Sequence, residues 1–324
     1  MWHSYYYRED NNILGIEMPH EKGCTRKVIR DWPRVNEAYV TQGVLLLQHD
    51  WVDGWDRELE RMNEGKRGRP FLFPESLVRF AVMLRTALRL PFRQLQGILD
   101  ALAGFLAIKV PDYTTLWHRN NQCLSALPRP DLTGSDWTLA IDSTGIKVSD
   151  RGEWMREKWH VHRGWIKVHM AVEVVSGAIV GIQVSDEGSP DAPFLPGLVE
   201  QAAGLLPGRI ARVTADGAYD TFENFDFLAS RGIDPAIKLR KNASVRCRGH
   251  SFARPKAVRE LRTLGEEEWK RRHQYNTRWK SETGFSAVKR RVGEAVRSKR
   301  PDLALKEAET MFIQYAIMRD GGLR

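Results

Sequence analysis

Two aspartates stand where an acidic side chain is least expected. Asp142 lies in the middle of an apolar run, Thr138–Lys147, and Asp216 follows a second one, Val213–Ala215. A carboxylate inside an apolar strand costs several kcal/mol unless it is paired or holds a metal ion. Ligands of α/β sheets gather at the carboxyl ends of strands, so two neighbouring strands would bring both acids into one site. Taken singly, each aspartate is equally compatible with a turn or cap.

A third acid lies in a segment with helical spacing, between residues 275 and 289. At about 100° per residue, one face of about 60° carries an aromatic side chain, two cations and one acid. These residues are Tyr275, Arg278, Glu282 and Lys289. Phe285 and Val288 form a separate apolar side on which the helix can pack. Alone, such a face is typical of a solvent-exposed stripe in which Glu282 forms a salt bridge. Beside two strand aspartates, Glu282 is predicted to be a metal ligand.

Three convergent carboxylates are suited to one kind of chemistry. Mg²⁺ prefers oxygen ligands and keeps several waters, and Mn²⁺ is the expected substitute. Two such ions about 3.5–4 Å apart activate an attacking oxygen and stabilise a leaving one. Without metal, the three acids would repel one another and shift their pKa values. Nearby Arg and Lys side chains would then hold a phosphate backbone.

The secondary-structure pattern predicts how these acids are positioned. After residue 136 the strands and helices are expected in the order βββαβαβ, followed by helices. The expected strands are 137–148, 165–175, 178–185, 209–215 and 235–239, and the expected helices between them are 192–203 and 221–231. This order predicts an α/β fold with a mixed, RNase H-like sheet (βββαβ-αβ-α), in which the first and fourth strands lie side by side.

The N-terminal part of the chain has a different pattern. Residues 1–30 are expected to form a tail, 31–127 a mostly helical DNA-binding domain, 128–136 a linker and 137–324 the catalytic domain. That last domain would contain a basic insertion at about 242–272 with one helix, from Pro255 to Leu264. Apolar residues at helical spacing follow Pro74, and further helices are expected at 92–102 and 113–124.

Two features of the helical domain suggest contacts with DNA. The last two helices resemble a helix-turn-helix, in which Arg119 would face a groove, although an ordinary helical hairpin is about as compatible. The segment Gly65–Pro70 resembles an AT-hook, whose arginines, here Arg67 and Arg69, enter an A·T-rich minor groove. A plain basic loop is the alternative for this segment.

Charge and composition favour a nucleic-acid partner. The 324-residue chain has a net charge of +9, and the segment 238–300 alone carries 20 Lys/Arg against 6 Asp/Glu. A surplus concentrated in one region is better explained by phosphate contacts than by a solvated surface. The three cysteines are far apart, and no apolar stretch approaches the roughly 20 residues that span a bilayer. We therefore expect a protein of the cytoplasm that binds nucleic acid and has no membrane partner.

These motifs together resemble the DDE transposases of the bacterial and archaeal IS5 group, within the IS4-like superfamily. The superfamily signature Y-(2)-R-(3)-E-(6)-K is met without a gap at 275–289, and its Asp-x-Ala-Tyr motif at 216–219. The first-aspartate motif resembles Ile141–Lys147. Further likeness appears in Arg240-Lys241-Asn242-Ala243 and in Trp165-x-Lys167-x-His169.

The resemblance implies a function and a set of site residues. A homodimer would bind the terminal inverted repeats of its own element, hydrolyse a phosphodiester to a free 3′-OH and join that end to target DNA. By this likeness, Asp142, Asp216 and Glu282 hold two Mg²⁺ ions. DNA contacts are expected from Tyr275, Arg278, Lys289, Arg240, Lys241, Asn242, Arg67, Arg69 and Arg119.

Three other functions are compatible with parts of the sequence. His160-Val161-His162 fits the motif of HUH nucleases, for which Tyr275 would be the nucleophile, but this leaves the three acids unused. An RNase H-like nuclease would cleave DNA without strand transfer. A domesticated transposase would act only as a DNA-binding regulator, and such a protein has no need to keep all three acids.

Overall fold

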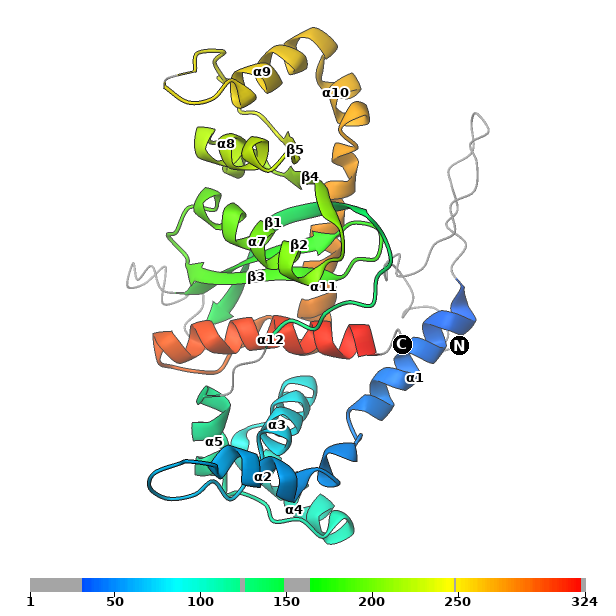
Figure 1. The fold of residues 1–324 in the computed structure, drawn as a ribbon, viewed down its shortest axis with the longest axis vertical. Helices are drawn as coiled ribbons and strands as arrows, with labels where there is room; N and C mark the ends of the chain where they lie inside the picture. The colour runs from blue at the N-terminus through cyan, green and yellow to red at the C-terminus, as the bar shows by residue number, and fades with distance from the viewer. Residues whose placement is uncertain (1–30, 123–125, 149–163, 248, 322–324) are drawn as a thin grey trace, which may run out of the picture.

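A mixed β-sheet forms the centre of the molecule (Figure 1). The computed structural model describes residues 31–122, 126–148, 164–247 and 249–321, so Cys24, Cys123, His160 and His162 lie outside the described residues. The strands have the order β3-β2-β1-β4-β5, and β6 pairs with β1. Their bounds are β1 Asp136–Val148, β2 Trp165–Glu173, β3 Ile179–Asp186, β4 Arg209–Ala215, β5 Asp234–Ile237 and β6 Ala295–Val296.

The pairing of β1 explains the topology. β1 runs antiparallel to β2 and parallel to β4, and β4 runs parallel to β5. The predicted RNase H-like arrangement is therefore confirmed, including the adjacency of the first and fourth strands. Because Ile141 pairs with Ala215 in the parallel register, Asp142 lies in the middle of β1, level with the carboxyl end of β4, which Asp216 directly follows.

Helices cover both faces of this sheet. α7 (Leu195–Leu205) and α8 (Phe222–Ser230) share one core with Leu139 and Ile141 of β1. On the other face, α11 (Trp279–Val292) and α12 (Pro301–Gly321) pack on Ile146 of β1 and on apolar residues of β2 and β3. Alternate side chains of a strand point to opposite faces, so Asp142 faces the α11 side.

The N-terminal region is helical, as predicted, and lies beyond α12 in Figure 1. It contains α1 (Trp32–Leu45), the 3₁₀ turn η1 (Asp50–Val52), α2 (Trp55–Asn63), α3 (Glu75–Leu88), α4 (Phe92–Leu106) and α5 (Tyr113–Gln122). The apolar residues at helical spacing after Pro74 are buried on α3 at Leu77, Phe80, Ala81 and Leu84. Leu88, the next in that spacing, is exposed where the helix ends at a left-handed Arg89. Arg85 of α3 pairs with Glu307 of α12 at 3.1 Å and so joins this region to the sheet domain.

The basic insertion differs from the prediction in one respect. It contains two helices, α9 (Ala253–Leu264) and α10 (Glu266–Arg272), where one was expected. Gly265, with φ of 77°, ends α9. Three glutamates then occupy the first turn of α10, where their negative charges stabilise the helix by interacting with the positive end of its dipole. Within the described residues, no helix is long and apolar enough to cross a membrane.

The segment that carries the third acid also differs from the prediction. Tyr275–Arg278 forms the 3₁₀ turn η4, and the α-helix α11 begins only at Trp279. The expectation of one continuous helical face from Tyr275 to Lys289 is therefore wrong. A 3₁₀ turn has about three residues per turn, which rotates Tyr275 away from the position that α-helical spacing predicts.

Candidate active site

Asp142 lies on β1 and faces α11. Its Oδ1 atom accepts a hydrogen bond from the Ser143 amide at 2.9 Å, and its Oδ2 atom pairs with Nη1 of Arg278 at 2.8 Å. The hydroxyl of Ser281, a fully buried residue of α11, lies 3.4 Å from the same Oδ2 atom and donates at 2.8 Å to the Arg278 carbonyl. These contacts fix the carboxylate against the start of α11.

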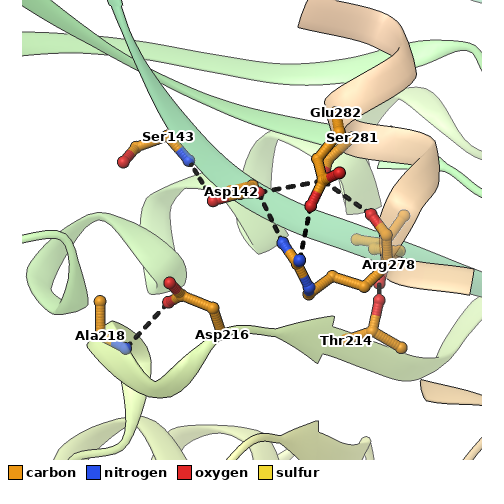
Figure 2. Close-up of polar contacts among 9 residues, drawn as sticks. Asp142, Ser143, Thr214, Asp216, Ala218, Arg278, Ser281 and Glu282 are labelled. Atoms are coloured by element: carbon orange, nitrogen blue, oxygen red, sulfur yellow. Dashed lines mark hydrogen bonds and ion pairs between the residues drawn. The ribbon is translucent and has the colours of Figure 1, made fainter. Parts of the chain in front are cut away.

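Arg278 links the first and third acids (Figure 2). Its second terminal nitrogen pairs with Oε1 of Glu282 at 2.5 Å, one helical turn further along α11. Burial would lower the pKa of Arg278, but the charges of Asp142 and Glu282 outweigh it and raise that pKa. The guanidinium therefore stays cationic and balances two carboxylates that come from different elements.

Asp216 directly follows β4 and begins the turn η3 (Gly217–Tyr219). Its Oδ1 atom accepts a hydrogen bond from the Ala218 amide at 2.8 Å, which caps that turn. The β1–β4 register pairs Ile141 with Ala215, so the next residue of each strand brings Asp142 alongside Asp216. The two aspartates are thus neighbours although 73 residues separate them in the sequence.

The charges of the three acids act on one another. Burial raises the pKa of Asp142, and the charges of Asp216 and Glu282 raise it further, against the Ser143 amide and Arg278, which lower it. A divalent cation would relieve this repulsion, and carboxylate oxygens are the donors that Mg²⁺ prefers. The residue types therefore fit Mg²⁺. In this geometry, the described residues contain no group of three or more His, Cys, Asp or Glu side chains close enough to hold a metal ion.

The two other residues of the 275–289 motif lie on either side of the acids. Tyr275 is buried and packs on Trp269 of α10, with ring centroids 5.5 Å apart. Burial raises the pKa of its hydroxyl, as do the charges of Asp216 and Asp142. Lys289 donates from Nζ to Oγ1 of Thr144 at 2.9 Å, two residues beyond Asp142 on the same face of β1.

A buried ion pair that the sequence analysis missed supports the Asp216 turn. Asp220, whose side chain is fully buried, accepts from Nε and Nη2 of Arg254 at 2.6 and 2.9 Å. It also accepts from the Arg240 amide at 2.9 Å. Asp220 directly follows the Asp-x-Ala-Tyr motif, which is a sequence signal for it. No local pattern indicates Arg254, because it is 34 residues further along the chain on α9.

The remaining predicted DNA contacts fall into two groups. Arg240, Lys241 and Asn242 are exposed beside the Asp216 turn, where Arg240 donates to the Gly217 carbonyl at 3.2 Å. Arg240 and Asn242 also line a cavity of about 220 Å³ there. Of the three acids, Asp216 is the one whose turn Arg240 contacts.

The residues of the helical region are arranged differently. Arg67 and Arg69 are exposed in a loop whose base is closed by two hydrogen bonds between Asn63 and Phe71. Arg119 pairs with Glu75 at 2.8 Å and donates to the Phe73 carbonyl. Only 11% of the Arg119 side chain is exposed, so its guanidinium is directed into the helical region, contrary to the expectation that it faces a DNA groove.

The fold, with one acid on β1 and one in the turn after β4, defines an RNase H-like protein with an acidic site where β4 ends beside the middle of β1. A family model described as a transposase DDE domain matches residues 133–317, and a second model with the same description matches residues 40–151. The chain therefore belongs to the transposase DDE domain family.

Three solved structures are similar to this chain at low identity. The piggyBac transposase synaptic complex with hairpin DNA is 11% identical, with a TM-score of 0.37 over 87% of this chain and 73% of that chain. The Drosophila P element transposase strand transfer complex is 15% identical, with a TM-score of 0.29 over 59% of this chain and 43% of that chain. A chain of the simian T-cell lymphotropic virus intasome in complex with the PP2A regulatory subunit B56 gamma is 13% identical. Its TM-score is 0.25 over 56% of this chain and 58% of that chain.

Proposed function

We propose that this protein is a transposase of an IS5-group insertion sequence, which cleaves DNA at terminal inverted repeats and joins the ends to target DNA. The observation that carries the proposal is that, in a chain of this family, Arg278 pairs with both Asp142 and Glu282 while the β1–β4 register sets Asp216 beside Asp142. β1, the turn after β4 and α11 each supply one acid. A strand-transfer assay tests the proposal: the purified protein, incubated with pre-cleaved terminal-repeat DNA, a supercoiled plasmid and MgCl₂, should produce covalently joined products.

The proposed reaction has two steps. In the first, the oxygen of a water molecule attacks the phosphorus at the element end, the bond to the 3′ oxygen breaks, and a free 3′-OH remains. In the second, that hydroxyl attacks a phosphorus of target DNA and displaces another 3′ oxygen, so no covalent bond to protein forms. Asp142, Asp216 and Glu282 would hold two Mg²⁺ ions, which when bound activate the attacking oxygen and stabilise the leaving one.

The protein's cations would hold the DNA strand. Arg278 and Lys289 lie on either side of Asp142 along β1 and α11, within reach of a phosphate placed at the acids. Arg240, Lys241 and Asn242 would extend this surface past the Asp216 turn. We propose that two copies of the chain bind two element ends together, and that the region 31–127 contributes a separate DNA contact through Arg67 and Arg69.

Salt should weaken end binding steeply. We expect log Kd to rise linearly with log salt, and neutralisation of about six phosphates would weaken binding by about 10³-fold between roughly 50 and 200 mM. Fluorescence anisotropy of a labelled terminal-repeat duplex over a NaCl series measures this slope. A flat response would contradict the assignment of the 238–300 segment as a phosphate surface.

Phenylalanine at position 275 separates the DDE and HUH mechanisms. We expect Tyr275→Phe to weaken cleavage only partly, because the buried ring that packs on Trp269 is kept and no phosphotyrosine is needed. A denaturing gel after protease treatment, with 3′-end analysis, measures the product. Complete loss of cleavage, with a DNA–protein adduct formed by the unmodified protein, would instead support an HUH nuclease.

The same assays distinguish the remaining alternatives. Cleavage without joining of pre-cleaved ends would indicate an RNase H-like nuclease. Specific end binding without either reaction in Mg²⁺ or Mn²⁺ would indicate a DNA-binding regulator. The full set of acids favours the transposase over the regulator, and membership of the transposase DDE domain family favours it over the nuclease.

A further inference from the structure

The Trp165-x-Lys167-x-His169 motif has no part in the reaction proposed above, yet it leads into a buried polar cluster. The β1–β2 register pairs Asp142 with Met170, so the alternate residues Lys167 and His169 of β2 point to the opposite face of the sheet. That face is the one covered by α7 and the connection before it. The cluster therefore lies behind the acids and does not face the same side as α11.

Asp191 is the centre of this cluster. Its Oδ1 atom lies 3.1 Å from Nζ of Lys167 and 3.5 Å from Nδ1 of His169. Lys167 also donates to the Ser189 carbonyl at 2.8 Å, and Nε2 of His169 lies 2.8 Å from Oγ of Ser185. One carboxylate thus pairs with Lys167 and lies against the His169 ring, and so fixes the connection between β3 and α7 to β2.

The imidazole of His169 is held as a neutral group. It is fully buried, and burial lowers its pKa to about 4 although the charge of Asp191 opposes this. A neutral ring has one N–H donor, which we assign to Nδ1 because it faces the carboxylate. The ring also stacks on Phe194 at a centroid distance of 3.9 Å and an angle of 13°. The cation of the cluster is therefore Lys167.

The cluster reaches the Asp216 turn through two buried residues. Asn224 donates from one amide nitrogen to the carbonyls of Ala192 and Tyr219, each at 3.0 Å, and so joins the two connections. Tyr219, three residues after Asp216, is fully buried, and the charge of Asp191 adds to burial in raising its pKa. Within the described part of the chain, Nδ1 of His169 and the Tyr219 hydroxyl are buried without a hydrogen bond, and Oδ1 of Asp191 is held by its ion pair with Lys167.

We propose that Lys167, His169 and Asp191 are positioning residues, which hold the β3–α7 connection against the turn that carries Asp216 and so fix that carboxylate relative to Asp142. This role rests on the proposed function, because it serves the same acids. None of the three is proposed to touch DNA. Loss of the Lys167 cation would leave Asp191 as a largely buried, poorly compensated charge, and the connection would relax away from the turn.

A pair of substitutions at position 167 tests the role. Lys167→Met should lower kcat for end cleavage by at least about tenfold, the range typical of residues that orient metal ligands, and leave the KM for DNA unchanged. The MgCl₂ concentration for half-maximal cleavage should rise. Lys167→Arg keeps the ion pair with Asp191 and should restore most of the rate. A residue that contacts DNA would instead raise the KM.

Hydrogen–deuterium exchange gives a readout that does not depend on activity. Lys167→Met should increase amide exchange in peptides covering 187–194 and 216–221. The control is Arg231→Met, which breaks the exposed pair with Glu200 at 2.8 Å and should change neither exchange nor cleavage. Asp191→Asn, which keeps the side-chain shape, replaces Lys167→Met if that variant does not fold.

The outcomes separate this inference from the proposed function. If the unmodified protein cleaves DNA but the folded Lys167→Met variant keeps both its kcat and its exchange pattern, the positioning role is overturned. An equal loss in Lys167→Met and Arg231→Met would also overturn it. If the unmodified protein cleaves no DNA while exchange at 216–221 still responds, the coupling stands and the proposed function fails.

Discussion

Asp142→Asn, Asp216→Asn and Glu282→Gln are each expected to stop DNA cleavage and to leave binding of the element ends largely intact. An amide keeps the shape of the carboxylate but removes the charge that would hold a divalent cation. Metal activation contributes several kcal/mol, and about 1.4 kcal/mol corresponds to a tenfold change, so the rate should fall by at least about 10³-fold. A labelled terminal-repeat duplex in MgCl₂, resolved on a denaturing gel, measures the rate, and anisotropy of the same duplex measures binding.

The chain offers matched controls for these variants. Asp136 lies on the same strand as Asp142 but is exposed and pairs with Arg209, and Glu267 is an exposed acid of α10. Asp136→Asn and Glu267→Gln should therefore cleave normally. Burial already raises the pKa of Asp142, so a neutral residue there should not lower the thermal midpoint. Near-normal cleavage by any one of the three acid variants would remove that residue from the site.

Arg254→Met should be among the most destabilising substitutions in the sheet domain. It leaves the fully buried Asp220 carboxylate with only the Arg240 amide, and breaking a buried pair in this way costs about 3–5 kcal/mol. The free energy of unfolding, measured by urea denaturation, should fall by that amount. Cleavage should fall as well, because the pair supports the turn that begins at Asp216.

A double substitution separates the stability lost with the ion pair from the cost of leaving the Asp220 carboxylate buried and uncompensated. Asp220→Asn combined with Arg254→Met removes both charges, so it should recover part of the stability that Arg254→Met loses. Arg231→Met breaks an exposed pair and should cost no more than about 1 kcal/mol. A loss of about 1 kcal/mol or less in Arg254→Met would show that α9 is not held to the Asp216 turn by this pair.

Much of the fold was predictable because its elements have strong local patterns. The apolar residues of β1 and β4 and the helical stripe of α3 depend on neighbours within a few residues, so their strands and helices appear in the sequence itself. The order of elements after residue 136 then restricts the sheet to few topologies, and the RNase H-like one is found. Asp142 was singled out by its place inside an apolar strand, whereas Asp216 and Glu282 gained meaning only in combination with it and with the family motifs.

Where local geometry departs from a regular helix, the sequence prediction failed. The spacing of Tyr275 and Arg278 suits an α-helix, but these residues form a 3₁₀ turn in which Tyr275 packs against α10. The second helix of the insertion was missed because it has only seven residues, too few for a periodic pattern. Arg119 was assigned to DNA by its place in a helix-turn-helix, whereas Glu75 on another helix pairs with it.

The sequence by itself determined which residues carry charge, where strands and helices form and which acids are unusual, because these depend on side-chain chemistry and on short-range periodicity. Only the tertiary structure decided that Arg278 lies between Asp142 and Glu282, that Arg254 pairs with Asp220 and that Asp191 binds Lys167 from behind the sheet. Such partners are set by strand register and helix packing, which bring together residues that no local pattern relates.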